Sequence, residues 1–357
     1  MKFFYYLRSL DRVLFFSIFG ISLIGLSVIF SLTQTNQNLF TLDLFNLAIG
    51  FIAMIMIGFI DYRAVKNLSI IGYIFFVLAL VFVGLKGQMI MGAKRWIDLG
   101  FWQLQPSELI KIFLISTLAI ILQNEKKYQF KILLKIVIYS AIPIALVLIQ
   151  PDLGTASVLI VIALNALFFA KIPKKTWVMI IIIFIVSGFF GYSSLKPYQK
   201  NRIDTFLNPQ KDIKGSSYNI NQSKIAIGSG GLLGRGLGRG SQSQLNFLPV
   251  AYADFVFAGM AESYGFVGSL IYLCLYLLML YQIIKIIQIT PDKYSHFFAS
   301  SIFIIFLYQA FVNISGNLGL VPITGITLPF TSYGGSSMLV MFILAGVLQS
   351  IYIRHKK

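Results

Sequence analysis

The sequence predicts an all-α, polytopic transmembrane protein that crosses the bilayer about ten times and forms a single domain over residues 1–357. Of its 357 residues, 57% are hydrophobic and 11% are charged, and the mean hydropathy is +0.83. Soluble domains are roughly half apolar and about a quarter charged, and so few charges could not cover a core of this size. The apolar residues also fall into long continuous runs.

Each run provides the approximately 20 apolar residues that a bilayer crossing requires. The first is too long for a signal-peptide core and lacks a small-residue cleavage site, so we expect a retained span. An even number of crossings places both termini on one side. The predicted spans are 13–32, 44–60, 68–85, 106–122, 132–149, 154–170, 176–193, 254–284, 297–318 and 335–353.

Basic residues select the cytoplasmic side, because short cytoplasmic loops carry most Lys and Arg. On this count both termini are cytoplasmic, and the outer loops 33–43, 150–153 and 319–334 contain no Lys or Arg. Two outer segments are basic: 86–105, and the long extracytoplasmic loop at about 194–253 between spans 7 and 8. Their positive charge indicates either an anionic ligand or ordinary translocation of long loops, which cross the membrane largely regardless of charge. The cytoplasmic set is Lys2, Arg8, Arg12, Arg63, Lys66, Lys126, Lys127, Lys171, Lys174, Lys175, Lys285, Lys293, Arg354, Lys356 and Lys357.

The net charge of +17 does not indicate a nucleic-acid partner, because the basic residues are scattered at loop edges. Orientation and anionic membrane lipids explain the charge better. The single cysteine, Cys274, lies in an apolar run and is predicted to fill the core. The glycine-rich part of the long loop, residues 228–240, lacks a strict nucleotide-binding motif, and we interpret it as flexible backbone that folds over a membrane-level site.

Two acidic residues near the outer ends of spans are candidates for polar interactions. Glu108 and Lys111 lie three residues apart on one predicted helix face and can pair. The pair is either a structural anchor or a functional group, since a lysine about 8 Å inside a span is costly unless it is used. Asp152 lies in the first turn of the sixth span, where the helix dipole stabilises a negative charge. It could equally position a metal or a substrate.

Two more acids follow the long loop where the chain re-enters the membrane. Asp254 has no Lys or Arg nearby in the sequence, and an unpaired carboxylate at a low-dielectric edge can act as a general base near neutral pH. Glu262 is two turns deeper, where it acts on the substrate or hydrogen-bonds a neighbouring span.

Further polar residues flank the outer ends of other spans. Lys94 and Arg95 suit charge-assisted bonds to a phosphate-bearing ligand. Trp96 beside them is a candidate for contact with the same substrate, or it anchors the segment at the membrane interface. Ser332 belongs to a re-entrant turn before the last span, where exposed amides could bind an anion. Ordinary helix capping would use the same residues.

Five motifs in this order resemble the SEDS family of shape, elongation, division and sporulation proteins, and together they span nearly the whole chain. Residues 242–249 are more similar to its RodA-like elongation members than to its FtsW-like division members. The motifs are Gly92-Ala93-x-Arg95-Trp96-Ile97, Gln105-Pro106-Ser107-Glu108-x-x-Lys111, Gln150-Pro151-Asp152-Leu153-Gly154-Thr155, Ala226-Ile227-Gly228-Ser229-Gly230-Gly231-Leu232 and Leu328-Pro329-Phe330-x-Ser332-Tyr333-Gly334-Gly335-Ser336-Ser337.

The resemblance implies an inverting peptidoglycan glycosyltransferase that polymerises lipid II at the outer face of the bacterial cytoplasmic membrane, with a class B penicillin-binding protein as partner. Asp254 occupies the family's essential acidic position and would deprotonate the acceptor hydroxyl. Lys94, Arg95 and Lys111, or a divalent cation (Mg or Mn) near Asp152, would stabilise the leaving pyrophosphate.

The chain departs from the family pattern around that acid, where it carries Val250, Tyr252, Ala253 and Ser263 in place of more polar residues. Two other functions are compatible with the sequence. One is a transporter that flips lipid-linked precursors, and the other is an inert scaffold for the penicillin-binding protein. The outward clustering of charged residues favours surface chemistry over a polar path through the membrane.

Overall fold

The computed structural model describes residues 9–34, 36–90, 93–98, 100, 103–123, 130–194, 200, 216–244, 247 and 250–356. Five of the basic residues used to predict the orientation, Lys2, Arg8, Lys126, Lys127 and Lys357, lie outside these ranges, as does most of the first half of the long loop.

Every predicted span coincides with a helix. Eight of these helices are long and apolar enough to cross a membrane. Crossing by the other two, the 17-residue α7 and the 21-residue α8, stays a prediction. The helices are α2 (Arg12–Leu32), α3 (Gln37–Phe59), α4 (Tyr62–Lys86), α5 (Pro106–Gln123), α6 (Phe130–Ile149), α7 (Leu153–Phe169), α8 (Lys174–Ser194), α12 (Val256–Ile289), α13 (Lys293–Asn317) and α14 (Gly335–His355).

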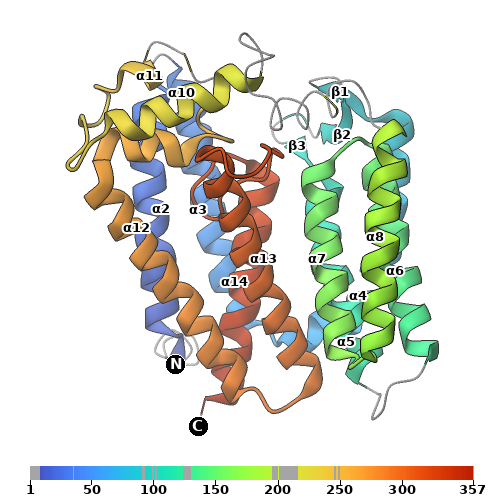
Figure 1. The fold of residues 1–357 in the computed structure, drawn as a ribbon. Coiled ribbons are helices and arrows are strands. Elements are labelled where there is room, and N and C mark those ends of the chain that lie inside the picture. The colour runs from blue at the N-terminus through green and yellow to red at the C-terminus, as the bar shows by residue number, and fades with distance from the viewer. Residues whose placement is uncertain are drawn as a thin grey trace.

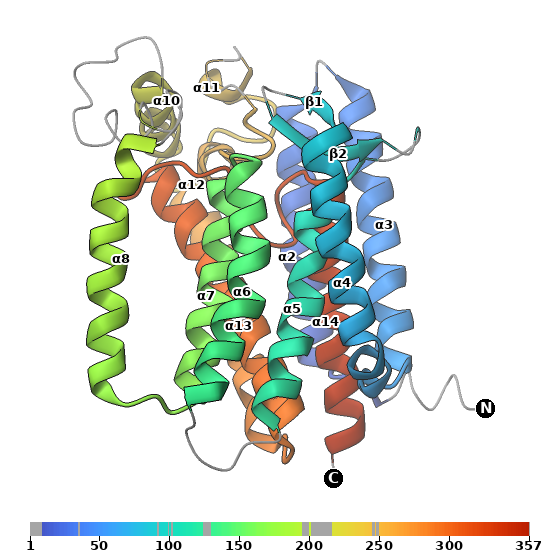
Figure 2. The same ribbon diagram turned by 90° about the vertical axis from the view of Figure 1, so that its right-hand side faces the viewer.

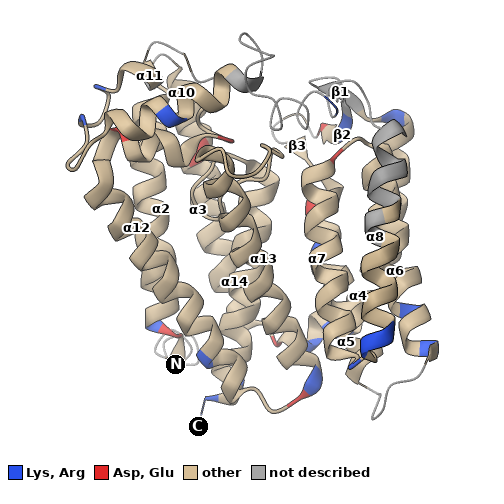
Figure 3. Ribbon diagram, viewed as in Figure 1, with Lys and Arg blue, Asp and Glu red and all other residues tan. Residues whose placement is uncertain are grey.

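The helices stand side by side in one bundle (Figures 1 and 2). Helix α13 joins two groups, because it contacts α12 and α14 on one side and α5 and α7 on the other. The start of α2 and the end of α14 lie at the same end of the bundle (Figure 1). There, the backbone N–H of Asp11 donates to Oε1 of Gln349 at 2.8 Å. Lys and Arg also gather at this end (Figure 3), as expected of a cytoplasmic face.

The opposite end carries elements that the sequence did not predict. The segment 86–105 contains a small antiparallel sheet of β1 (Gln88–Ile90), β2 (Ala93–Asp98) and β3 (Gln103–Leu104), in the order β1-β2-β3. The long loop contains α10 (Ser216–Ser229) and the short α11 (Ser241–Gln244). In Figure 1, α10 lies across this end of the bundle, where it contacts α12.

Helix α12 is interrupted at Gly265, whose φ of 68° and ψ of −163° lie outside the helical region. Only glycine adopts such a backbone conformation readily. The single predicted span 254–284 is therefore two helical segments joined by a kink.

The glycine-rich segment docks on this kink through its backbone, which corrects our interpretation of it as a flexible cover. A Cβ atom at Gly230 would lie 2.0 Å from the carbonyl oxygen of Ala261, so glycine is required for the close approach. The backbone bonds run from the N–H of Phe266 to Gly231 O (2.8 Å), from Val267 to Leu232 O (3.0 Å), from Arg235 to Glu262 O (2.9 Å) and from Gly236 to Ser263 O (3.0 Å).

Candidate functional site

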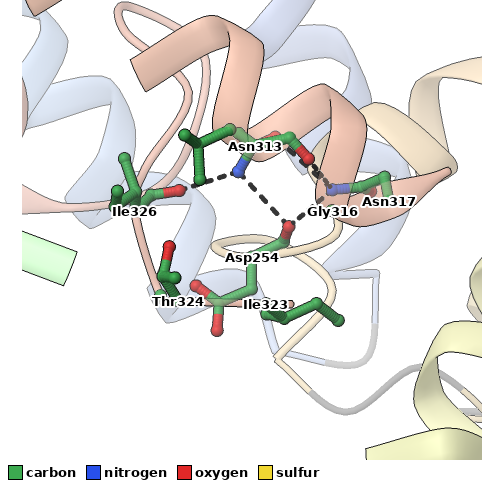
Figure 4. A pocket seen from close by; sticks show the side chains of 9 residues that line it. Asp254, Asn313, Gly316, Asn317, Ile323, Thr324 and Ile326 are labelled. Carbon is green, nitrogen blue, oxygen red and sulfur yellow. Dashed lines mark hydrogen bonds between the residues drawn. The ribbon is translucent and has the colours of Figure 1, made fainter. Parts of the chain in front are cut away.

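Asp254 lies in the turn that leads into α12, and it lines a small pocket at the end of the bundle opposite the two termini. Other walls come from the last turns of α13 and from residues 323–326. Figure 4 shows the side chain of Asp254 extending from the asparagines of α13 toward Thr324. The hydroxyl oxygen of Thr324 is buried and has no hydrogen-bond partner in the described part of the chain. The pocket therefore places a carboxylate beside an unused polar group.

Two asparagines on α13 hold the backbone of Asp254. The side-chain amides of Asn317 and Asn313 donate to its carbonyl oxygen, at 2.9 and 3.3 Å. Asn313 also donates to Ile326 O at 2.8 Å, and Oδ1 of Asn317 accepts from the N–H of Ala258 at 3.0 Å. The sequence analysis missed both residues, although a pair of buried asparagines one turn apart in an apolar helix is itself a signal.

Ser332 supports the same turn from the other side. Its hydroxyl donates to the carbonyl oxygen of Ala253 at 2.7 Å and accepts from the N–H of Leu328 at 2.9 Å. The N–H of Tyr333 donates to Tyr252 O at 2.9 Å. Ser332 is buried and its hydroxyl is used within the protein, so its observed contacts are positioning contacts.

A second acid near this turn also escaped the sequence analysis. Asp43, in the second turn of α3, is buried, and within the described residues neither carboxylate oxygen has a hydrogen-bond partner. The pKa of Tyr333 is raised mainly by burial, and also by the charges of Asp43 and Tyr252. Asp43 therefore lies close enough to affect the segment that supports Asp254.

The predicted pair on α5 is confirmed. Nζ of Lys111 lies 2.8 Å from Oε1 of Glu108, and both side chains are buried. The second carboxylate oxygen of Glu108 has no partner among the residues that the structure describes. A buried ion pair of this kind is strongly destabilised when one partner is removed.

Arg95 and Asp152, predicted separately, interact with each other. Their charged groups lie 3.8 Å apart, and Arg95 also donates to Gln150 O at 2.9 Å and to Pro151 O. Asp152 caps α7 by accepting from the N–H of Thr155 at 3.1 Å.

Asp152 makes two further hydrogen bonds within the protein. It accepts from the hydroxyl of Thr155 and from the amide of Gln105, both at 3.0 Å. Across the described ranges, no group of three or more His, Cys, Asp or Glu side chains could hold a metal ion. A cation shared between Asp152 and the phosphates of a substrate needs no such group, so the divalent cation stays a prediction.

The other predicted residues occupy distinct places. Lys94 and Trp96 lie on β2 and are partly exposed, and Nζ of Lys94 donates to Leu85 O at 3.3 Å. Glu262 is fully buried in the first segment of α12, where its Oε1 accepts from the N–H of Gln242 at 2.9 Å. Glu262 thus connects α12 to the start of α11.

Comparison with known proteins shows similarity over the whole chain. The family model of FtsW, RodA and SpoVE, described as cell cycle protein, matches residues 9–357. The peptidoglycan glycosyltransferase MrdB of Escherichia coli K12 is 33% identical over 354 residues, which cover 97% of this chain and 94% of that protein. Stage V sporulation protein E of Bacillus subtilis is 38% identical over 311 residues, covering 85% and 84% of the two chains.

Solved structures share the fold. A chain of a peptidoglycan synthase complex that coordinates polymerization and crosslinking has a TM-score of 0.84 and 26% identity, covering 98% of this chain and 99% of that chain. The rod shape determining protein RodA of Thermus thermophilus has a TM-score of 0.74 and 25% identity, with 98% of each chain covered.

Proposed function

The chain belongs to the FtsW, RodA and SpoVE family, also called SEDS, and we therefore propose that it is a peptidoglycan glycosyltransferase. In this proposal it polymerises lipid II at the outer face of the bacterial cytoplasmic membrane during cell elongation, with Asp254 as general base. The observation that supports the assignment of the base is the position of Asp254, which lines a pocket at the predicted outer end of the bundle while its backbone carbonyl is held by two asparagines of α13.

The chemistry requires a base on one side of the reacting carbon and a stabilised leaving group on the other. The carboxylate of Asp254 takes the proton of the acceptor sugar hydroxyl. The hydroxyl oxygen forms the new bond to the anomeric carbon of the donor, and the bond to the polyprenyl pyrophosphate breaks with inversion. The hydrogen bonds from α13 to the carbonyl oxygen of Asp254 support this role, because they fix the backbone that carries the base.

The leaving pyrophosphate requires positive charge. Arg95 is engaged by Asp152 and by backbone carbonyl groups, and Lys111 is engaged by Glu108. Lys94 is partly exposed and donates to one neutral acceptor. Among these three cations, we therefore assign the phosphate contact to Lys94 and structural ion pairs to the other two.

A class B penicillin-binding protein is the partner that we propose. A solved relative belongs to a synthase complex in which polymerization and crosslinking are coordinated. Crosslinking of peptides is a separate reaction from polymerisation of glycan, so a complex that coordinates both supports a partner that carries out the crosslinking.

The replacement Asp254→Asn tests the base. The variant keeps the size and most of the polarity of the side chain but cannot accept the proton, so we expect a loss of lipid II polymerisation of at least about 10²-fold. Polymerisation is measured by gel analysis of glycan strands made by the purified protein with its partner. Thermal unfolding and partner co-purification should remain as in the wild type, and full polymerisation by the variant would refute the assignment.

A lipid-linked precursor transporter is the alternative function. The buried Glu108–Lys111 pair inside α5 favours it, because intramembrane charges often mark a transport path. Wild-type protein in vesicles separates the two functions. Lengthening of glycan supports the glycosyltransferase, whereas movement of precursor across the bilayer without any lengthening supports the transporter.

A further inference from the structure

We infer that the loop between α10 and α11, residues 230–240, is a membrane anchor that binds the phosphate headgroups of anionic phospholipids in the outer leaflet. We call this segment the arginine loop. The inference does not depend on the proposed function.

The arginine loop exposes large apolar side chains outside the helical bundle. Leu232 and Leu233 are 71% and 80% exposed, and Leu237 is also exposed. Ile225, on the preceding helix α10, is also exposed. Leucines this exposed in an ordinary water-facing loop would be an aggregation hazard, so they indicate contact with another apolar phase.

The surface next to these leucines identifies that phase as lipid. The N–H of Val267 donates to Leu232 O at 3.0 Å, and the N–H of Phe266 donates to Gly231 O at 2.8 Å. Phe266 and Val267 are themselves exposed on α12, one of the helices apolar enough to cross the membrane. The leucines therefore continue the lipid-facing surface of α12, and Figure 1 shows the loop at the outer edge of the bundle beside this helix.

The depth of the arginine loop is fixed by a second helix. The N–H of Gly238 donates to the hydroxyl of Ser31 at 2.8 Å, and the side-chain amide of Gln244 donates to Ser31 O at 2.6 Å. Ser31 lies in the last turn of α2, at the outward end of that span. The loop is thus held where the hydrocarbon layer meets the headgroups.

The positive charge of the arginine loop is complementary to the negative phosphates at that depth. Arg235 and Arg239 are exposed, and no acidic residue occurs between 230 and 244. Figure 3 shows positive residues at the outer edge of this loop. Guanidinium groups bind phosphate oxygens in a bidentate manner. Leucines alternating with arginines place apolar atoms in the acyl layer and cations at the headgroups, as in interfacial membrane anchors.

The first experiment measures depth with a spin label. The full-length protein with Cys274→Ser is labelled at Leu233→Cys and reconstituted in nanodiscs of phosphatidylcholine and phosphatidylglycerol. The matched control is Gly228→Cys, an exposed position on α10 with open space around it. We expect the label at 233 to collide with oxygen more than with a water-soluble nickel chelate, and the label at 228 to show the opposite.

Equal access of the nickel chelate to both labels would overturn the inference. The inference would also be overturned if the label at 233 became shielded from the nickel chelate only after the penicillin-binding protein is added, because a protein would then cover the loop.

The second experiment tests the phosphate contact. We expect the double variant Arg235→Gln/Arg239→Gln to bind fluorescent phosphatidylglycerol about tenfold to thirtyfold more weakly, the loss expected for two basic residues at a lipid surface. The control Lys175→Gln/Lys285→Gln removes the same charge at the other end of the bundle. The inference fails if both double variants lose affinity equally, or if neither does, although the fold is unchanged by circular dichroism.

Discussion

The carbonyl oxygen of Asp254 accepts hydrogen bonds from two side-chain amides of α13. Because these bonds hold the backbone of Asp254, they also influence where its carboxylate lies. Each hydrogen bond contributes only about 1 kcal/mol to stability. The effect of these hydrogen bonds on the reaction rate can be larger than their effect on stability, because a displacement of about 1 Å at a reacting group can lower the rate about 10²-fold. Asn313 and Asn317 are positioning residues in this account.

The replacement Asn317→Ala tests the positioning role. We expect kcat for lipid II polymerisation to fall about tenfold or more with little change in KM, because the carboxylate of Asp254 is no longer held in place. Asn165→Ala is the matched control, since Asn165 is also buried and donates to Ser301 at 3.0 Å. Both variants should lower the melting temperature, but a purely structural role of Asn317 would leave kcat equal in the two.

Lys94 and Arg95, adjacent on β2, have different neighbours, so their replacement should affect the melting temperature and kcat differently. Arg95→Gln removes an ion pair and carbonyl bonds that connect β2 to the turn before α7, and we expect a lower melting temperature. Lys94→Gln should leave the melting temperature nearly unchanged and lower kcat about tenfold or more, because a charge on the leaving group is lost. Equal effects on kcat and on stability in both variants would contradict this division of roles.

At the scale of elements, the kink of α12 and the glycine-rich segment form one unit. The kink at Gly265 frees backbone N–H groups that a continuous helix would use internally. The N–H groups of Phe266 and Val267 are then satisfied by carbonyl groups of residues 231 and 232. The two backbones approach closely at Gly230, Gly234 and Gly265, where a Cβ atom would lie 2.0, 2.2 and 2.3 Å from a backbone atom of the other segment.

The replacement Gly230→Ala tests this unit. The added Cβ would lie 2.0 Å from Ala261 O, and relief requires the backbone to move, so we expect a loss of about 1–3 kcal/mol or more. Gly228→Ala, two residues earlier, meets no atom within 4 Å and should stabilise α10 by up to about 1 kcal/mol. Thermal unfolding of the two variants in detergent measures the difference, and equal melting temperatures would argue against backbone docking.

The sequence was informative where local composition determines structure. Apolar runs long enough for the bilayer predicted every long helix, and the rarity of charges in those runs pointed to Asp254 and to the pair of Glu108 and Lys111. The kink at Gly265 was missed because its backbone bonds go to residues 231 and 232, far away in the sequence. The sheet β1-β2-β3 pairs residues that are close in the sequence, but strands of three, six and two residues are too short to give a clear alternating pattern. Asn313 and Asn317 form a visible pattern, two amides one turn apart in an apolar helix, but their role does not follow from it. That role depends on contacts with Asp254 O, which lies 59 and 63 residues away in the sequence.

At the scale of the whole molecule, the two ends of the bundle are built differently. The end opposite the termini carries the sheet, α10, α11 and the pocket of Asp254 (Figure 1). At the end that holds the termini, polar contacts connect the last helix to the starts of two others. Asp11, the N-cap of α2, bonds to Gln349 of α14, and Asp61, the N-cap of α4, lies 3.2 Å from Arg354 of α14. Basic residues gather at this second end (Figure 3), which predicts that it faces the cytoplasm.

Cysteine labelling in cells tests that orientation. In a Cys274→Ser background, Gly228→Cys on α10 should react with a membrane-impermeant maleimide added to intact spheroplasts, because it is exposed at the predicted outer end. Lys175→Cys, exposed in the first turn of α8 at the other end, should react only after the membrane is permeabilised. Reaction of both residues after permeabilisation shows that each thiol is accessible in the folded protein. The reverse pattern would place both termini outside and would remove Asp254 from the side of the membrane on which glycan is assembled.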